Sequence, residues 1–208
     1  MNIKKELEDA IRYSQHQRVR EILKANPELI NAPINEYEDT PLTKAVSFSD
    51  YEMIRLLLEE FHADPNIGDD ERTTALWSLS MDSMDNLSTE EILNAIDLLI
   101  AHGANPNLGT YMGMTPLMLA AEDVNLPVAQ KLLAHGADAK QKDIYGNTPL
   151  HWLPLYSGDD KAGVEQMIQL LITHGADIHD KDDQGKTPLD TALLYKNPVV
   201  IEAMRAYS

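Results

Sequence analysis

The chain has 208 residues, and its 34 acidic against 17 basic residues give a formal net charge of -17. This charge argues against nucleic acid and anionic membrane as partners, because both are bound through lysines and arginines that neutralise phosphate. No cysteine is present, which excludes a disulfide framework, a thiolate zinc site and a cysteine nucleophile.

The first 31 residues predict two amphipathic helical segments and lack the motifs that follow later. The N-terminus does not have the basic segment and apolar run of an export signal, and no stretch approaches the ~18 apolar residues of a membrane span. We therefore expect a cytoplasmic protein that does not insert into membranes, with residues 1–31 as a terminal capping unit.

From residue 40 onwards, two short motifs alternate. Thr-Pro-Leu, with one Thr-Ala-Leu variant at Thr74, starts at Thr40, Thr115, Thr148 and Thr187. His-Gly-Ala-Asn or His-Gly-Ala-Asp starts at His102, His135 and His174, with a degraded Phe-His-Ala-Asp at Phe61. Repeats of roughly 30 to 45 residues cannot bury their own apolar faces and must stack on neighbours.

Each motif has a helix-forming role. Threonine accepts hydrogen bonds from the first turn of a helix, and proline at the first helical position has no N–H to leave unpaired. The second helix of each unit is expected to begin at a capping box, as in Ser49 with Glu52 and Ser88 with Glu91, and to end at the glycine of the second motif. His62 takes the place of that glycine once, so we expect the helix before it to end differently.

The two motifs are not evenly spaced. The second motif's glycine position, occupied by His62, Gly103, Gly136 and Gly175, recurs after 41, 33 and 39 residues. The extra residues fall between the two helices of the Thr74 and Thr148 units. This predicts inserted loops at residues 81–89 and 156–163.

The pattern resembles the ankyrin-repeat family. The resemblance implies an all-α solenoid of about six stacked helix-turn-helix units with hairpin-like finger loops, in a single domain over residues 1–208. The units would be a cap at 1–31, repeats at 40–72, 74–113, 115–146 and 148–185, and a C-terminal cap at 187–208. Two fingers carry Glu38 and Arg72 where others have glycine, and we expect these two to be less regular.

Candidates for chemistry are few. Four histidines recur at or next to helix ends. His151 follows Thr-Pro-Leu, and in this family the residue at that position makes hydrogen bonds that join the turn to the helix. His179, with Asp180 and Asp182, could contact a metal, but the calcium-loop pattern from Asp180 lacks the carboxylate that supplies its principal ligand. Motifs for phosphate binding or nucleophilic catalysis are absent. We predict no enzyme activity, no metal and no cofactor.

The resemblance implies that a partner protein lies on the concave side, against finger tips and inner helices. Carried over position by position, the partner-binding residues are Glu36, Tyr37, Asp39, Phe48, Asp70, Glu71, Met81, Asp82, Tyr111, Met112, Met114, Glu122, Asp123, Ile144, Tyr145, Tyr156, Asp183 and Gln184. The last unit supplies Leu194 and Tyr195 at equivalent helix positions. For Phe48 and Leu194, packing under a neighbouring repeat is an equally open interpretation.

Charge points to the kind of partner. Residues 31–100 hold 16 acidic and 3 basic residues, a net charge of -13, and such a field attracts a cationic protein. We predict a monomeric, non-catalytic protein-binding module. The sequence leaves open an inhibitor or immunity protein, a scaffold or chaperone subunit of a larger complex, and a metal-dependent enzyme or effector.

Overall fold

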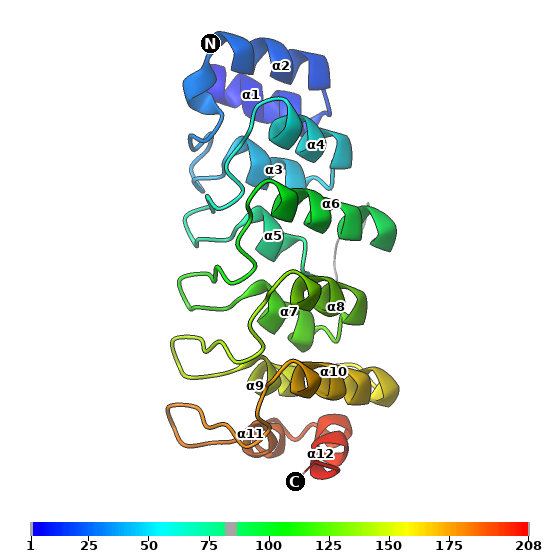
Figure 1. Ribbon diagram of the computed structural model, residues 1–208. Coiled ribbons are helices and arrows are strands. Elements are labelled where there is room, and N and C mark those ends of the chain that lie inside the picture. The colour runs from blue at the N-terminus through cyan, green and yellow to red at the C-terminus, as the bar shows by residue number, and fades with distance from the viewer. Residues whose placement is uncertain (1, 82–86, 208) are drawn as a thin grey trace. The chain divides into compact units, whose positions relative to one another are not determined.

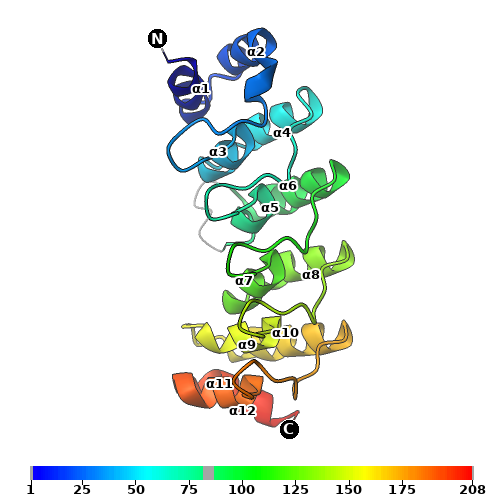
Figure 2. The same cartoon turned by 90° about the vertical axis from the view of Figure 1, so that its left-hand side faces the viewer.

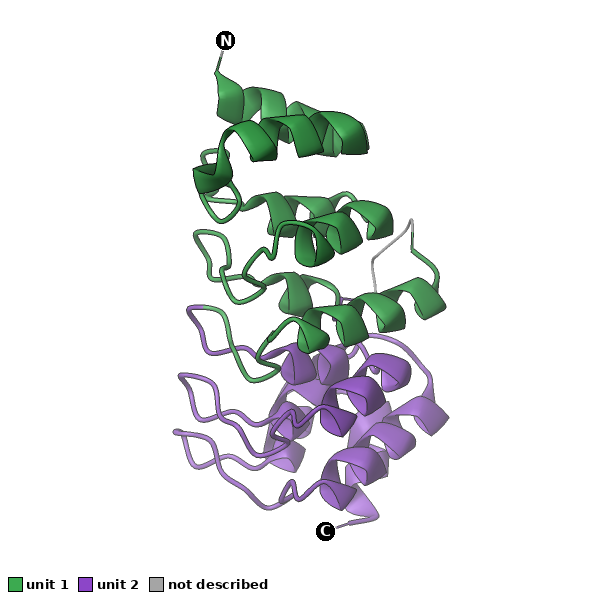
Figure 3. Cartoon of the chain, turned by 45° about the horizontal axis from the view of Figure 1, so that its top comes forward, with its two compact units in different colours: residues 1–79, 83–110 green, residues 80–82, 111–208 purple. Residues whose placement is uncertain are grey.

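The computed structural model describes residues 2–81 and 87–207, and in these ranges the chain forms twelve α-helices, two short 3-10 helices and no strand (Figure 1). The helices fall into two compact units, residues 1–79 with 83–110 and residues 80–82 with 111–208, as far as they are described (Figure 3). Each unit consists of inner helices next to the finger loops and outer helices behind them (Figure 2). The predicted all-α, helix-turn-helix architecture is confirmed.

The first unit begins with a helical pair that packs on the next repeat. Inner helices α1 and α3 contact each other, as do α3 and α5, while the outer helix α4 packs on α6. The bounds in this unit are α1 (Ile3–Arg12), α2 (His16–Ala25), η1 (Pro27–Leu29), α3 (Pro41–Ser47), α4 (Tyr51–Glu59), α5 (Ala75–Ser78) and α6 (Thr89–Ala101).

The second unit repeats this packing. Helix α7 packs on α8 and α9, and α10 contacts both α8 and α12. The bounds are α7 (Pro116–Glu122), α8 (Leu126–Ala134), α9 (Pro149–Trp152), η2 (Leu153–Leu155), α10 (Lys161–Thr173), α11 (Pro188–Tyr195) and α12 (Pro198–Arg205).

The inner helices start where the threonines predict. Thr40, Thr115 and Thr187 each accept a hydrogen bond from the backbone N–H three residues on, as part of a capping box. In four of the five motifs the leucine after the proline or alanine is buried in the core: Leu42, Leu76, Leu117 and Leu150 are at most 1% exposed, whereas Leu189 of the last motif is half-buried. The motif therefore specifies both where the inner helix begins and which side chain anchors it.

Only one of the two predicted outer-helix capping boxes is present. Ser88 and Glu91 cap α6 reciprocally, with Ser88 N–H donating to Glu91 at 2.9 Å. The prediction of Ser49 with Glu52 was wrong. Asp50 caps α4 by accepting from Met53 N–H at 2.9 Å, and Ser49 adopts a left-handed conformation with φ 54°.

That left-handed residue recurs wherever the turn between inner and outer helix is short. Ser14, Ser49, Val124 and Lys196 have φ between 51° and 56°, and each stands immediately before the N-cap residue of an outer helix. The Thr74 and Thr148 units carry extra residues at this point. Their outer helices α6 and α10 have 13 residues, against 9 in α4 and α8. The extra residues thus also extend the helices, since α6 already begins at Thr89 and α10 at Lys161, inside the ranges predicted as loops.

The outer helices end as the glycine motif predicts, and His62 is an informative exception. Gly103, Gly136 and Gly175 have φ of 92°, 86° and 95°. His62 has φ 52° and so lies in the same left-handed region. The predicted difference in how this helix ends is therefore limited to the backbone hydrogen bond made by the next residue. Ala63 N–H donates six residues back to Leu57, because the motif has one residue more there than in the other units.

The fingers at Glu38 and Arg72 are regular, contrary to our prediction. Their φ angles of 57° and 61° lie in the same left-handed region as the 75° to 80° of the finger glycines. An Asn or Asp at the start of four of the fingers, these two included, accounts for this, because its side-chain oxygen accepts from the backbone N–H groups two and four residues on. These residues are Asn35, Asp69, Asp143 and Asp182.

Successive fingers are joined by backbone hydrogen bonds within each unit. In the first unit, Asp70 N–H donates to Tyr37 C=O at 3.1 Å. In the second unit, Ile144 N–H donates to Met112 C=O and Asp183 N–H to Tyr145 C=O, both at 3.0 Å. Equivalent tip residues of neighbouring repeats are therefore held at a fixed spacing.

Candidate functional site

The surface formed by the finger tips and inner helices of a unit, here called its finger face, carries most of the predicted binding residues. In the first unit the exposed tip residues are Glu36, Tyr37, Asp70 and Glu71. Tyr37 is 60% exposed, although its ring is large and mostly apolar. The finger face of the first unit is therefore acidic, with one exposed aromatic ring.

The finger face of the second unit has a different character. Its exposed tip residues are Tyr111, Met112, Ile144, Tyr145, Asp183 and Gln184, and Tyr111 and Tyr145 are 54% and 51% exposed. At the end of α11, Leu194 and Tyr195 are 60% and 57% exposed. Packing under a neighbouring repeat, the alternative left open for Leu194, does not occur in the described residues. Apolar and aromatic side chains dominate this surface.

A hollow of about 290 Å³ connects the finger tips of the second unit to α11. Tyr145 and Gln184 line it from the fingers, and Leu194 and Tyr195 line it from the helix, with Lys186 between them. The Lys186 amine donates to the Gln184 side chain at 2.7 Å. The predicted tip residues and the exposed end of α11 thus share one depression.

Four other predicted residues are buried or half-buried, and a fifth is not described. Asp39 is only 8% exposed and accepts hydrogen bonds from Asn35 at 2.9 Å and Lys44 at 3.0 Å. Phe48 is half-buried, with Arg12 and Lys44 at 5.4 Å and 5.5 Å from its ring centroid. Both side chains are engaged in interactions within their own unit. Met81 and Met114 are half-buried, and Asp82 lies outside the described residues.

The three remaining predicted residues, Glu122, Asp123 and Tyr156, lie at the far ends of the inner helices. Asp123 is the C-cap of α7, and Glu122 and Tyr156 line a hollow of about 680 Å³. Two other residues of its wall, Gly158 and Asn197, were not among the predicted site residues. The only sequence signals were that Gly158 lies within the loop predicted at residues 156–163 and that Asn197 stands at the start of the last helix.

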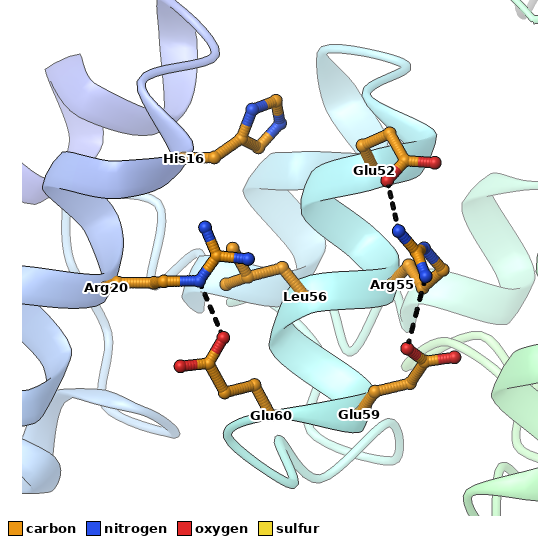
Figure 4. A pocket seen from close by; sticks show the side chains of 7 residues that line it. All are labelled: His16, Arg20, Glu52, Arg55, Leu56, Glu59 and Glu60. Atoms are coloured by element: carbon orange, nitrogen blue, oxygen red, sulfur yellow. Dashed lines mark hydrogen bonds and ion pairs between the residues drawn. The ribbon is translucent and has the colours of Figure 1, made fainter.

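A further hollow, of about 270 Å³, lies on the outer helices of the first unit (Figure 4). Arg20 of α2 donates to Glu60 at 2.6 Å, and Arg55 of α4 pairs with Glu52 at 2.6 Å and Glu59 at 3.5 Å. This hollow was not predicted from the sequence, although Glu52, Arg55 and Glu59 have the spacing of helical ion pairs. Because each of its three glutamates already pairs with an arginine, the hollow offers an incoming ion little attraction.

In the region predicted as the alternative metal site, the aspartates bind other residues of the fingers. Asp180 pairs with Lys142 at 3.0 Å, and Asp182 accepts from the backbone N–H groups of Gln184 and Lys186 at 2.8 Å. In the part of the chain that the structure describes, no three His, Asp or Glu side chains gather in the manner of a metal site. No helix in that part is long and apolar enough to cross a membrane.

His151 joins two repeats through both ring nitrogens. Thr148 N–H lies 3.2 Å from Nδ1, and Nε2 lies 3.1 Å from the Lys186 carbonyl oxygen. The carbonyl can only accept, so the network assigns the proton to Nε2 and leaves Nδ1 as the acceptor. The structural role predicted for this histidine is confirmed.

His151 makes stability sensitive to acid. Burial lowers the pKa of His151 below its ordinary value, against the opposing effects of the Lys186 carbonyl and of Asp182 and Asp180. The unfolded state then binds a proton at higher pH than the folded state, so this contribution to stability is complete above about pH 6.5 and is lost as the pH falls towards the folded-state pKa. Urea unfolding should show a free energy of unfolding that decreases between about pH 7.5 and about pH 5.5.

A matched variant isolates this effect. His151→Thr introduces the residue that stands at the same motif position in the Thr40 unit. It should be less stable at neutral pH, with a smaller decrease on acidification. An equal decrease in both proteins would mean that another group is responsible.

Comparison with known proteins agrees with this architecture. Models of ankyrin repeats in many copies match residues 7–58 and 99–152, and a single ankyrin-repeat model matches residues 145–183. The chain belongs to the ankyrin-repeat family. Ankyrin repeats generally mediate protein–protein interaction and are not catalytic modules, so the finger faces are the surfaces of interest in this ankyrin-repeat chain.

Curated relatives resemble part of this ankyrin-repeat chain. Proteins named ankyrin repeat, SAM and basic leucine zipper domain-containing protein 1 are 33% identical over 102 residues in Dasypus novemcinctus and 35% identical over 101 residues in Carollia perspicillata. These alignments include 49% and 46% of this chain, but only 20% of each relative. The matched part of the chain therefore spans about a fifth of the length of these relatives.

Proposed function

We propose that this ankyrin-repeat chain is a non-catalytic module that binds a basic protein through its finger faces. The acidic tips of the first unit attract the partner, and the aromatic and apolar tips of the second unit supply contact area. The observation that carries the proposal is the exposure of Tyr37, Tyr111 and Tyr145, each more than half exposed at a finger tip. Exposed aromatic residues on a rigid support are typical of protein interfaces.

Charge supports a basic partner. Glu36, Asp70 and Glu71 are exposed, and the backbone hydrogen bond from Asp70 to Tyr37 holds their two fingers together. Fixed charges of one sign accelerate association with a partner of opposite charge, and salt screens this effect. A cytoplasmic location and a monomeric state of the isolated chain stay predictions of the sequence.

The name of the relatives states that they contain SAM and basic leucine zipper domains beside ankyrin repeats. An ankyrin-repeat segment within a larger protein is compatible with a binding role. This similarity supports a protein-binding module without indicating its partner.

The first test uses a partner captured from the native source at low salt. Asp70→Lys combined with Glu71→Lys should reduce the association rate constant by about tenfold at low ionic strength, because two attractive charges become repulsive. The slope of that rate constant against salt should also decrease. Stopped-flow or surface-based kinetics at several salt concentrations measures both quantities.

Glu52→Lys combined with Glu59→Lys is the matched control. It makes the same change in net charge at exposed positions of the same unit, but on the outer helix α4. It should slow association much less than the finger-tip variant. Equal effects of the two variants would reject a role for the finger tips, and no effect of either would reject electrostatic attraction.

A further inference from the structure

The hollow of about 680 Å³ in the second unit is built around the extra residues of the Thr148 repeat. Its walls are the end of α7, η2 with residues 156–159 that follow it, and the turn between α11 and α12. We call residues 156–160 the inserted loop. The Thr40 and Thr115 repeats have a short turn at this place and therefore lack the residues that form such a wall.

Asn197 holds the inserted loop in place. Its side-chain amide donates to the carbonyl oxygens of Pro154 at 3.2 Å and Tyr156 at 2.7 Å, while its Oδ1 accepts from Val200 N–H at 3.1 Å. One residue thus caps α12 and fixes both ends of the turn that carries Tyr156. The wall is ordered before any partner arrives, which reduces the entropic cost of binding.

Gly158 permits the position of the Tyr156 ring. A Cβ atom at residue 158 would lie 2.2 Å from the Tyr156 hydroxyl oxygen and 2.4 Å from the ring carbon that bears it. Any side chain here must displace the ring. The close approach of glycine backbone and aromatic ring therefore shapes this side of the hollow.

The lining combines aromatic surface with acid. Tyr156, Tyr195 and Leu155 provide apolar surface, and Glu122 and Asp159 are the charged residues among the described lining. The Glu122 side chain is half-buried and makes no hydrogen bond or ion pair with another described residue. Burial raises the pKa of Glu122, and the nearby Asp123 carboxylate adds to this effect. A cation in the hollow would stabilise the ionised Glu122 carboxylate and so oppose both of these effects on its pKa.

We propose that this hollow accepts the side chain of an arginine from the partner protein, with the guanidinium beside Glu122 and against the tyrosine rings. A guanidinium is planar, stacks on aromatic faces and is more weakly hydrated than an ammonium, so it suits a wall of carboxylate and tyrosine better than lysine does. The proposal rests on the proposed function, and it adds the chemistry of one partner residue.

The position of Tyr195 connects the hollow to the finger face. Tyr195 also lines the smaller depression that contains Tyr145 and Gln184. A partner segment that lies on the finger face of the second unit can therefore place one side chain in the hollow. This continuity favours an arginine of a bound protein over a free small molecule.

The test uses two small probes and the full chain. N-acetyl-arginine-N-methylamide carries the guanidinium, and its citrulline counterpart has nearly the same shape but a neutral urea group. In ¹H–¹⁵N NMR titrations, the arginine probe should shift the amide signals of Ser157, Gly158 and Val199 and bind about fivefold more tightly than the citrulline probe, as for a partly exposed charge pair. Equal binding of the two probes, or shifts confined to other regions, overturns the proposal.

Two variants locate the effect, and a third is the control. Glu122→Gln keeps the shape and should lower the affinity of the arginine probe to that of the citrulline probe. Gly158→Ala should weaken both probes, because it displaces the Tyr156 ring. Glu165→Gln, at an exposed position of α10, removes the same charge outside the hollow and should change neither affinity. Unchanged arginine preference in Glu122→Gln overturns the proposal.

The captured partner separates this inference from the proposed function. Glu122→Gln should weaken binding of the partner by about fivefold, and unfolding curves of the variant should match those of the wild type. If the partner binds Glu122→Gln as tightly as the wild type but responds to the finger-tip variant, the arginine site is wrong and the proposed function stands. Loss of response to both variants would reject the proposed function as well.

Discussion

Leu117→Ala is expected to lower the free energy of unfolding by about 2 to 5 kcal/mol. Leu117 is 1% exposed at the start of α7, where the helix packs against α8 and α9. Truncation removes apolar contacts and leaves a cavity among helices that cannot fully collapse around it. Urea unfolding followed by far-ultraviolet circular dichroism measures the change.

Leu189→Ala provides the control for this prediction. Leu189 occupies the same position in the last Thr-Pro-Leu motif but is half-buried, in contrast to Leu117. Its truncation should cost about 1 kcal/mol, because less apolar surface is returned to water. Similar costs for the two substitutions would show that the motif, rather than burial, determines the importance of this leucine.

Gly146→Ala is expected to lower the free energy of unfolding by about 2 to 4 kcal/mol through two separate effects. The first is backbone strain, because Gly146 has φ 80°. The second is a clash with the next finger, since an added Cβ would lie 2.8 Å from the Asp183 backbone nitrogen. That nitrogen donates to Tyr145 C=O at 3.0 Å, so the clash would also disturb the hydrogen bond that joins the two fingers.

Gly185→Ala separates the two effects. Gly185 has φ 77°, close to that of Gly146, but an added Cβ would meet nothing within 4 Å. Its substitution should cost only the strain of a left-handed alanine, about 1 to 2 kcal/mol. Chemical denaturation gives the free energy of unfolding of both variants. The difference between them measures the energetic cost of the clash with the next finger. Equal costs would indicate that the finger spacing adapts without loss of stability.

The fingers show how a correct motif can lead to an incorrect prediction. Glu38 and Arg72 were expected to disturb their fingers because they replace glycine. The side chains of Asn35 and Asp69 accept two backbone N–H groups each in those fingers and hold the left-handed residue in place. The signal was in the sequence, four residues before the end of each finger. Local hydrogen bonding outweighed the intrinsic preference for glycine at a single position.

The binding surface was predictable in part. The motif spacing placed Tyr37, Tyr111 and Tyr145 at exposed tips, because the position of a residue in a repeat determines its place on the finger. Asp39 in the finger and Phe48 at the end of α3 were predicted from repeat positions in the same way, yet Lys44 contacts both side chains. Periodicity gives a residue's place in the repeat, but the neighbours available to its side chain determine whether it stays free for a partner.

The sequence by itself determined the ankyrin-repeat architecture, the start of each inner helix and the acidic character of the first unit, because these follow from local capping, apolar periodicity and composition. The tertiary structure alone decided that the extra residues of the Thr148 repeat form a wall with Asn197, some 40 positions later. It also decided that Glu122 faces this wall without an ion-pair partner among the described residues. Such a site brings together three distant segments, and no local pattern in the sequence specifies how their side chains meet.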